Sequence, residues 1–370
     1  MQLEPFQLER FFAQHEFSAR YLLSSSDCDG LPMSELLALA SPAQRAAWDA
    51  LTLGYTESAG LPQLREAIAR HYPTATPADV LVLSPGEANF IAMNVLLSAG
   101  DHVVCMRPAY QSLSEVPRAL GCDVSFWGPH IVDGRWSFDP EELAALLTPR
   151  TKLVVLNFPH NPTGFIPSSD EYRAILQIVE RHGAWLFSDE MYRGLASHPS
   201  LHLQAACDLT PRALSLWGMA KSFGLAGTRI GWLVVKDANV RERIQRFRDY
   251  LTICNSAPSE LLALIALDHS EALIARNQAT IDTNRAHFAA FCRAHASVFT
   301  DLAAEGGSTT FTAVKVPGTT LGFSEALVRD TGVMSVPSEM FGYVSGFLRV
   351  GLGRKNLPQT LDVLADHLAR

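Results

Sequence analysis

Long apolar runs and clusters of basic residues are both missing from this chain of 370 residues. No stretch approaches the roughly 18 consecutive apolar residues that a membrane-spanning helix requires. The formal net charge is -8, so neither a nucleic acid nor an anionic membrane surface is expected as a partner. The first ten residues lack the basic start and apolar stretch of a signal peptide, which favours a cytoplasmic location.

Cysteine pairs are missing too, and with them the common disulfide and zinc frameworks. The six cysteines are scattered without a C-x-x-C pair, as is typical of reduced thiols in cytoplasmic proteins. His198 and His202 are four residues apart, but Pro199 argues against a helical metal site. A G-x-S-x-G elbow is absent, and Gly351-Leu-Gly353 lacks the rest of a nicotinamide-binding fingerprint. We therefore expect no metal and no nicotinamide cofactor.

What the chain does contain is an alternation of short apolar runs and amphipathic stretches. Seven runs are mostly Val, Leu, Ile and Phe, as in strands buried on both faces of a parallel sheet. They cover residues 80–83, 102–106, 123–127, 153–158, 185–188, 213–216 and 231–235. Helical periodicity lies between many of them, for example at 61–72 and 170–182. The order predicts an α/β fold with a mostly parallel seven-stranded sheet flanked by helices.

Past about residue 236 the pattern becomes mainly helical, with two short β-rich sections. The helices expected there cover 238–250, 258–291 and 357–369, and the β-rich sections lie near 309–316 and 347–352. Residues 6–17 predict a separate amphipathic helix near the N-terminus. We predict a large domain of residues 45–236 and a smaller α+β domain made of 1–44 with 237–370.

Lys221 stands after a predicted strand and before a Gly-rich turn, with Arg229 eight residues further on. Glycine lets the backbone approach a ligand closely, and Arg suits bidentate phosphate recognition. A lysine that can be desolvated beside such an arginine is a candidate for a Schiff base. Alone, however, a lysine at this position is usually a solvated loop residue.

Three further motifs are ambiguous one at a time. They are Gly86-Glu87-Ala88, Asn161-Pro-Thr-Gly164 and Asp189-Glu-Met-Tyr192. The first opens a helix, where backbone N–H groups and the helix dipole favour a phosphate. The second also fits a plain turn. Asp189 ends a strand, where ligands bind in open α/β sheets, although Asp equally serves as a helix N-cap.

The order of these motifs resembles that of the class I and II aminotransferases, a fold-type-I family of pyridoxal phosphate (PLP) enzymes that includes aspartate aminotransferase. The resemblance is strong over about residues 50–235. Further matching pieces are Gly54-Tyr55-Thr-Glu-Ser-Ala-Gly60, Pro108-Ala-Tyr110 and Arg349. The resemblance implies a PLP cofactor, an amino acid and a 2-oxo acid as substrates, and a homodimer.

Roles around the cofactor follow from the resemblance. Lys221 would hold PLP as a Schiff base and later carry a proton, and Asp189 would pair with the protonated pyridine nitrogen. Asn161 and Tyr192 would hydrogen-bond the phenolic oxygen, and Tyr110 would stack on the ring. The resemblance thus makes Lys221, Asp189 and Tyr192 the catalytic residues.

The phosphate and the substrate complete the expected site. Arg229, the backbone of residues 86–88 and Tyr55 of the neighbouring subunit would bind the phosphate. Arg349 would clamp the substrate α-carboxylate in a two-point grip, with Asn161 beside it. The loop with Ser25 and Ser26 is expected to line the side-chain end of the site, together with Trp217.

Two residues depart from the family pattern. Gly218 stands where the family usually has a serine whose hydroxyl binds the phosphate, so Ser84, Ser222 or a backbone amide is expected to replace it. Glu87 stands in the phosphate turn, where its carboxylate must point away from the phosphate.

The reaction itself has open alternatives. The segment 22–30 is more similar to the branch that contains capreomycidine synthase, which cyclises a modified arginine, so a PLP-dependent elimination or cyclisation stays open. A non-catalytic PLP-binding regulator is a third reading. It is disfavoured by the complete set of Lys221, Asp189 and Arg349 and by the lack of a basic helix-turn-helix.

Overall fold

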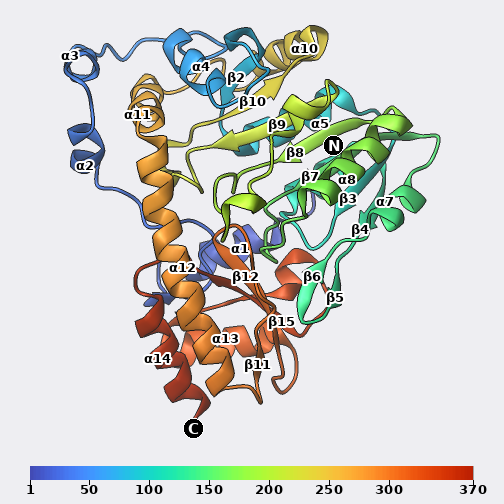
Figure 1. Cartoon of the computed structure of the whole chain (residues 1–370), viewed down its shortest axis with the longest axis vertical. Helices are drawn as coiled ribbons and strands as arrows, with labels where there is room; N and C mark the ends of the chain where they lie inside the picture. Colours follow the sequence, from blue (N-terminus) through green and yellow to red (C-terminus); the bar gives the residue numbers. More distant parts are fainter. Residues whose placement is uncertain (370) are drawn as a thin grey trace.

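The computed structural model describes residues 1–369 and is built around a seven-stranded mixed sheet (Figure 1). Its strands are β2 (Val80–Leu83), β3 (His102–Met106), β4 (Asp123–Trp127), β7 (Thr151–Asn157), β8 (Trp185–Asp189), β9 (Ala213–Gly218) and β10 (Gly231–Val235). The spatial order is β2-β10-β9-β8-β7-β3-β4, with β10 antiparallel to both neighbours and the other pairs parallel. The predicted fold class is confirmed, and all seven predicted strands are present.

The sheet is buried on both faces, which is why its strands are continuous apolar runs. In β2, Val80 and Val82 join one apolar cluster, whereas Leu81 and Leu83 join another on the opposite face. The flanking helices are α4 (Pro62–Ala69), α5 (Pro85–Leu96), α6 (Ser112–Ala119), α7 (Pro140–Leu146), α8 (Ser169–His182), α9 (Ala206–Leu209), α10 (Ala238–Arg248) and α11 (Ala257–Asp268). Helices therefore cover the sheet as predicted.

A smaller antiparallel sheet lies at the other end of the molecule, in the order β11-β12-β15-β14 (Figure 1). It consists of β11 (Phe299–Thr300), β12 (Thr309–Val314), β14 (Val336–Pro337) and β15 (Phe347–Gly351). The helices of this part are α1 (Gln7–His15), α12 (Ser270–Ala294), α13 (Thr320–Thr331) and α14 (Leu357–Leu368). The predicted domain boundaries at 44/45 and 236/237 stay a prediction.

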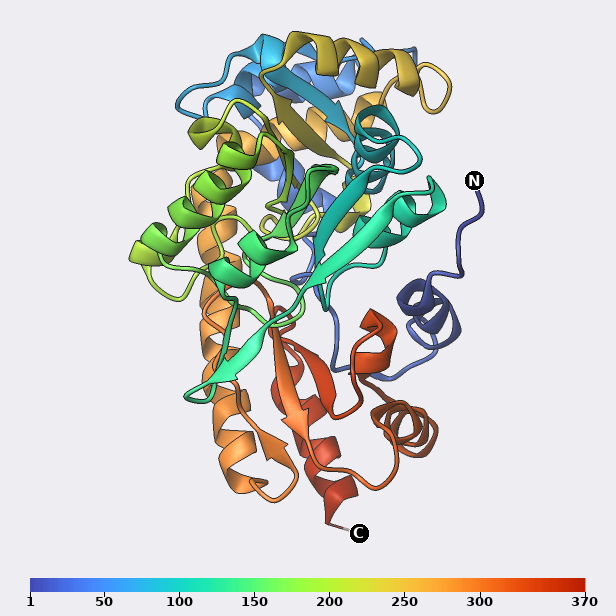
Figure 2. The same ribbon diagram turned by 90° about the vertical axis from the view of Figure 1, so that its right-hand side faces the viewer.

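The helical stretch expected over 258–291 is confirmed, but the chain divides it into two helices. α11 ends at Asp268 and α12 begins at Ser270, and His269 between them leaves the helical conformation at φ -119° and ψ 23°. The His269 ring contacts the Leu39 carbonyl oxygen through Nε2 at 2.8 Å. Helix α12 then runs from the larger sheet down to the smaller one, as both views show (Figures 1 and 2).

Short elements complete the chain. They are α2 (Met33–Ala38), α3 (Pro42–Asp49), β1 (Tyr21–Leu22), β13 (Val333–Met334), the hairpin of β5 (His130–Val132) and β6 (Arg135–Ser137), and four 3-10 turns, η1 (Pro77–Asp79), η2 (Pro199–Leu201), η3 (Ala226–Thr228) and η4 (Ser338–Phe341). Within residues 1–369, no helix is long and apolar enough to span a membrane, and no group of three acidic, His or Cys residues is placed to bind a metal.

Candidate active site

A cavity of about 410 Å³ opens beside the ends of β7 and β8, whose last residues Asn157 and Asp189 line it. Most of the predicted site residues share its wall. They are Ser25, Ser26, Gly86, Tyr110, Asn161, Asp189, Tyr192, Lys221, Arg229 and Arg349. The carboxyl ends of parallel strands are where open α/β sheets bind ligands, so the topology accounts for the position of the cavity.

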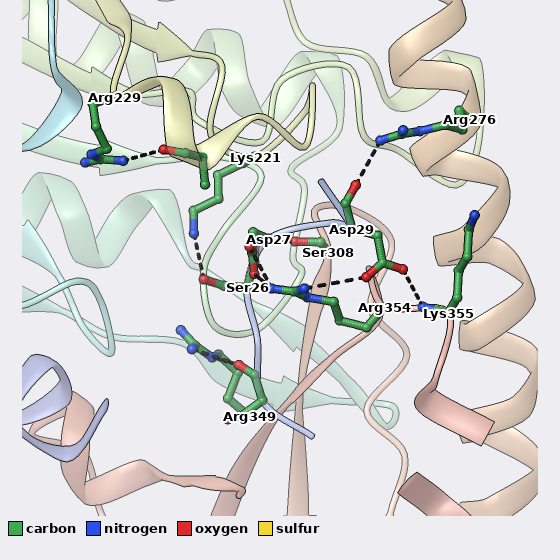
Figure 3. A network of polar contacts seen from close by, with 12 residues as sticks. Ser26, Asp27, Asp29, Lys221, Arg229, Arg276, Ser308, Arg349, Arg354 and Lys355 are labelled. Atoms are coloured by element: carbon green, nitrogen blue, oxygen red, sulfur yellow. Dashed lines mark hydrogen bonds and ion pairs between the residues drawn. The ribbon is translucent and has the colours of Figure 1, made fainter. Parts of the chain in front are cut away.

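Lys221 points into this cavity from the turn after β9 (Figure 3). Its Nζ donates a hydrogen bond to the Ser26 hydroxyl at 2.8 Å. Burial lowers the pKa of the Lys221 ammonium below its usual value, because the charged form loses its hydration. A solvated surface lysine is excluded, and an amine that loses its proton more easily than usual is what a nucleophilic lysine needs.

Asp189 is buried at the end of β8, and few groups of the protein stabilise the negative charge of its carboxylate. Its carboxylate accepts a hydrogen bond from the Met191 amide at 3.2 Å, and it makes no ion pair with any of residues 1–369. Burial raises the pKa of Asp189 to about 7. No helix begins after Asp189, so the N-cap alternative is wrong. A buried carboxylate of this kind suits a ligand that brings its own cation.

Asn161, Tyr192 and Tyr110 approach the cavity from three different segments. The amide of Asn161 donates to Asn157 Oδ1 at 2.8 Å, which fixes the turn after β7. The Tyr192 hydroxyl is buried and has no hydrogen-bond partner within the described chain. Tyr110 donates from its hydroxyl to Glu9 Oε1 at 2.7 Å. A buried hydroxyl without a partner is costly, so Tyr192 is suited to a polar ligand atom.

Arg349 lies on β15, and only 1% of the residue is exposed. Its Nε and Nη2 donate to the Ser24 carbonyl oxygen at 3.1 and 2.8 Å, and its Nη1 donates to Asn161 Oδ1 at 3.3 Å. The rings of Phe12 and Phe341 lie 5.7 and 5.3 Å from the guanidinium carbon. No carboxylate of residues 1–369 forms an ion pair with it. A buried guanidinium without an anionic partner suits a carboxylate ligand.

The predicted phosphate end combines Arg229 with the start of α5. Arg229 has φ +54° and donates from Nη1 to the Ala226 carbonyl at 2.9 Å. Gly86 lines the cavity in the first helical turn, where amides precede the intrahelical hydrogen bonds. The expectation for Ala88 is wrong, because its amide already donates to the Ser84 carbonyl at 2.9 Å.

The two departures from the family pattern have physical explanations. A Cβ at Gly218 would lie 2.7 Å from Gly231 Cα, so the adjacent strand excludes a serine. Ser222 is not a substitute, because its hydroxyl donates to the Arg193 carbonyl at 2.6 Å and accepts from Trp217 at 3.2 Å. The Glu87 carboxylate points away from the cavity, as expected.

Two contacts hold the Glu87 side chain on the far side of the phosphate turn. The Thr252 hydroxyl donates to Glu87 Oε1, and Arg248 Nε lies 3.6 Å from the same oxygen. The negative charge in this turn is therefore balanced by an arginine rather than directed at the cavity.

Like Glu87 and Ala88, the predicted residues Tyr55 and Trp217 lie outside the cavity. Tyr55 is 90% exposed, beside a shallow surface hollow lined also by Leu53 and Pro258. Trp217 is buried in the core against Trp232, with ring centroids 5.3 Å apart, so its expected place in the side-chain pocket is wrong. The reason is the direction of the Trp217 side chain. It lies on the face of β9 that packs against α4 and α11, where it joins an apolar cluster.

One wall of the cavity is formed by residues that carried no motif in the sequence. Glu9, Phe12 and Glu16 line it from α1 and its C-terminal end, and Asp27 lines it from the loop before α2. The amphipathic pattern of residues 6–17 predicted the helix. It carried no signal for where the helix packs.

The loop with Ser26 is clamped against β15 by close backbone contact (Figure 3). The amide of Gly351 donates to the Leu23 carbonyl at 2.7 Å, and a Cβ at Gly351 would lie 2.0 Å from the Ser25 carbonyl oxygen. The Ser308 hydroxyl donates to the Ser26 carbonyl at 2.7 Å. Glycine at 351 is thus required for the loop to reach Lys221.

These residues fit PLP. A buried carboxylate without a cation suits a protonated pyridine nitrogen, and Lys221 supplies a partly buried amine for the aldehyde. Arg229 and the amide at the start of α5 suit a phosphate. The hydroxyl of Tyr192, which has no partner within the described chain, and the side-chain NH2 group of Asn161 are available to a phenolic oxygen.

Comparison with known proteins agrees with this chemistry. The family model "Aminotransferase class I and II" matches residues 21–368. Capreomycidine synthase of Streptomyces vinaceus is 32% identical over 98% of this chain and 93% of its own length. A PLP-dependent aminotransferase of Streptococcus suis has a TM-score of 0.93 at 27% identity, covering 100% of this chain and 99% of that one. The PLP-dependent cyclase OrfR has a TM-score of 0.90 at 30% identity, covering 100% and 98%.

Proposed function

The chain belongs to the class I and II aminotransferase family of PLP-dependent enzymes, and from this we propose that it transfers an amino group between an L-amino acid and a 2-oxo acid. The observation that carries the proposal is the shared cavity of Lys221, Asp189 and Arg349. It combines an amine, a carboxylate for the cofactor nitrogen and a guanidinium for the substrate carboxylate.

When bound, PLP supplies an electron sink for the charge that develops at the substrate Cα. Asp189 in its ionised form keeps the pyridine nitrogen protonated. Arg349 orients the substrate by its carboxylate, and the Phe12 and Phe341 rings shield this ion pair from water. The amine of Lys221 would hold the cofactor and, when free, would be placed to move a proton between Cα and C4′ as general base and acid. Ser26 holds the released amine in the cavity through its hydroxyl.

The assembly proposed for this function is a cytoplasmic homodimer. Leu53, Tyr55 and Tyr250 are apolar or aromatic residues with exposed fractions of 82, 90 and 90%. Leu53 and Tyr55 line one surface hollow, and neighbouring exposed apolar side chains are typical of interaction sites. A second copy seated there would bring Tyr55 to the phosphate of the neighbouring site, as in the family pattern.

Single-turnover spectroscopy of the purified holoenzyme tests the reaction. Amino donors are mixed with the enzyme without an oxo acid, and the visible band of the lysine-bound cofactor is followed. Conversion to the pyridoxamine form, with restoration by a 2-oxo acid, supports aminotransfer. If no amino acid changes the band, the proposal is refuted.

A second candidate is elimination or cyclisation on the same scaffold. It is favoured by the similarity to capreomycidine synthase and to the cyclase OrfR over almost the whole chain. The same experiment separates the two reactions. Release of ammonia or of a cyclic product without an oxo acid, and without accumulation of the pyridoxamine form, supports this candidate.

A non-catalytic regulator is distinguished by DNA binding. A gel-shift titration with random-sequence and genomic DNA fragments is expected to show none, because the formal net charge is -8 and the chain has no basic cluster.

A further inference from the structure

Asp27 is the one carboxylate of the cavity wall that has a cationic partner among residues 1–369. The carboxylates of this wall are those of Glu9, Glu16, Asp27 and Asp189. Arg354 Nη2 donates to both oxygens of Asp27, at 3.1 and 2.9 Å, and Arg354 Nη1 lies 3.5 Å from Asp29 Oδ1 (Figure 3). The other three carboxylates form no ion pair within the same residues. The contact with Arg354 therefore sets Asp27 apart.

Arg354 itself lies outside the cavity. It follows β15 and lines a hollow of the molecular surface together with Arg20 and Lys355. The side chains of Arg354 and Asp27 are 27 and 26% exposed, so the pair stands between solvent and the cavity. The charge of Arg354 thus meets the cavity wall through the carboxylate of Asp27.

The backbone around Arg354 is fixed from two sides. The side-chain amide of Asn284, on α12, donates to the carbonyl oxygens of Leu352 and Arg354, both at 2.8 Å. On the other side, a Cβ at Gly353 would lie 2.6 Å from the Asp27 carbonyl oxygen, so the two segments are in close backbone contact. This packing holds the guanidinium where it can reach the Asp27 carboxylate.

Asp27 is also close to the amine that holds the cofactor in the proposed function. It directly follows Ser26, whose hydroxyl accepts a hydrogen bond from Lys221 Nζ at 2.8 Å. Burial lowers the pKa of the Lys221 ammonium, and among the neighbouring charges that of Asp27 opposes this most strongly. The other titratable or charged groups near Lys221 are Glu9 and Glu16 on the α1 side, Cys28 in the loop, Asp189 on β8 and Arg349 on β15.

The two charges of the ion pair act on this amine in opposite directions. The carboxylate of Asp27 stabilises a positive charge on the Lys221 nitrogen, and the guanidinium of Arg354 reduces that effect. We propose that Arg354 is a positioning residue that acts through Asp27 and sets how tightly the Lys221 nitrogen holds its proton. This inference rests on the proposed function, because it takes Lys221 as the lysine that holds PLP and moves the proton.

A pH titration of the holoenzyme tests the opposite signs. The visible band of the lysine-bound cofactor changes when its nitrogen loses a proton, so the midpoint pH is measured directly. Asp27→Asn is expected to lower the midpoint by about 0.5 unit and Arg354→Gln to raise it by about 0.5 unit, the scale of a partly exposed pair. The double variant is expected to return close to the wild type. Shifts of the same sign in both single variants, as a loosened Ser26 loop alone would give, overturn the inference, and so does the absence of a shift in both.

Two further variants separate the ion pair from a general change of charge. Lys355→Gln is the matched control, because it removes a positive charge from the next residue, whose contact with Asp29 is made by its backbone amide. Its midpoint is expected to equal that of the wild type, and a rise as large as that of Arg354→Gln overturns the inference. Arg354→Lys keeps the charge and is expected to raise the midpoint less than Arg354→Gln. It is compared with Asp27→Asn if the glutamine variant does not fold, and shifts of the same sign in these two again overturn the inference.

The cofactor-free chain separates this inference from the proposed reaction. With ¹³C-labelled lysine, the Lys221 signal in an NMR titration of the full-length protein is assigned by its loss in Lys221→Ala. The pKa of its ammonium is expected to fall in Asp27→Asn and to rise in Arg354→Gln. These opposite shifts support the inference even if the cofactor is not bound to Lys221, which would refute only the proposed function. A cofactor bound to Lys221, with unchanged midpoints in both variants, refutes the inference and leaves the reaction standing.

Discussion

The Nζ of Lys221 lies 2.8 Å from the hydroxyl of Ser26, a residue 195 positions earlier in the chain. This contact joins the turn after β9 to the loop that precedes α2, and it places the lysine at the wall shared with Arg349. We expect Ser26→Ala to bind PLP normally but to slow the half-reaction about five- to tenfold, as the loss of one hydrogen bond of about 1 kcal/mol implies. Stopped-flow spectroscopy with an α-deuterated donor measures this step. An unchanged rate would show that Ser26 does not position the released amine.

Gly351→Ala tests the clamp that holds the Ser26 loop. The added Cβ would lie 2.0 Å from the Ser25 carbonyl oxygen, so the loop must move. We expect the free energy of unfolding to fall by about 1–3 kcal/mol and the dissociation constant of a carboxylate ligand to rise, because Ser24 also orients Arg349. Urea unfolding and calorimetry check both. Gly128→Ala is the control, since its Cβ would meet only the Arg107 carbonyl, at 3.7 Å; equal effects in both variants would contradict this explanation.

Gly218→Ser would restore the residue typical of the family without restoring its function. Its Cβ would lie 2.7 Å from Gly231 Cα and 2.9 Å from the Ile230 carbonyl oxygen, so β9 and β10 must separate. We expect weaker PLP binding and a loss of stability of about 1–3 kcal/mol. Equilibrium dialysis of PLP and thermal unfolding measure the two effects. Tighter PLP binding would show that the strands yield and that the hydroxyl reaches the phosphate.

The strands around this site could be predicted because a strand buried on both faces is a continuous apolar run, as in Val80–Leu83. Lys221, Asp189 and Arg349 could be proposed as site residues because the order of their motifs resembles that of the class I and II aminotransferases. The helix 6–17 could be predicted as well, but periodicity shows only that one face is apolar. It does not show which distant segment covers that face, so Glu9 and Glu16 were missed. The break at His269 was missed because the helical propensity of the segment continues through it.

Asp189 makes the cofactor-free protein sensitive to pH. Its pKa in the folded state is about 7, above the value of 3.8 for an exposed aspartate, so the folded state binds more protons than the unfolded state between these values. The free energy of unfolding should therefore fall as the pH rises through this window, by up to about 1.4 kcal/mol for each pKa unit of difference.

Asp189→Asn should remove this part of the pH dependence. Urea unfolding of cofactor-free wild type and variant at pH 5 and pH 8 gives the comparison, in which shared contributions of other groups cancel. The variant is expected to gain stability relative to the wild type at pH 8. If the difference between the two proteins is the same at both pH values, the Asp189 carboxyl is not protonated in the cofactor-free fold.

The central claim is that Lys221 is the residue to which PLP is bound, and the chain has only four other lysines, Lys152, Lys236, Lys315 and Lys355. Reduction of the holoenzyme with borohydride, digestion and mass spectrometry identify the modified peptide. We predict the phosphopyridoxyl group on Lys221, loss of the visible band in Lys221→Ala and an unchanged band in Lys236→Ala. Modification of another lysine, or a band that survives in Lys221→Ala, would contradict the account.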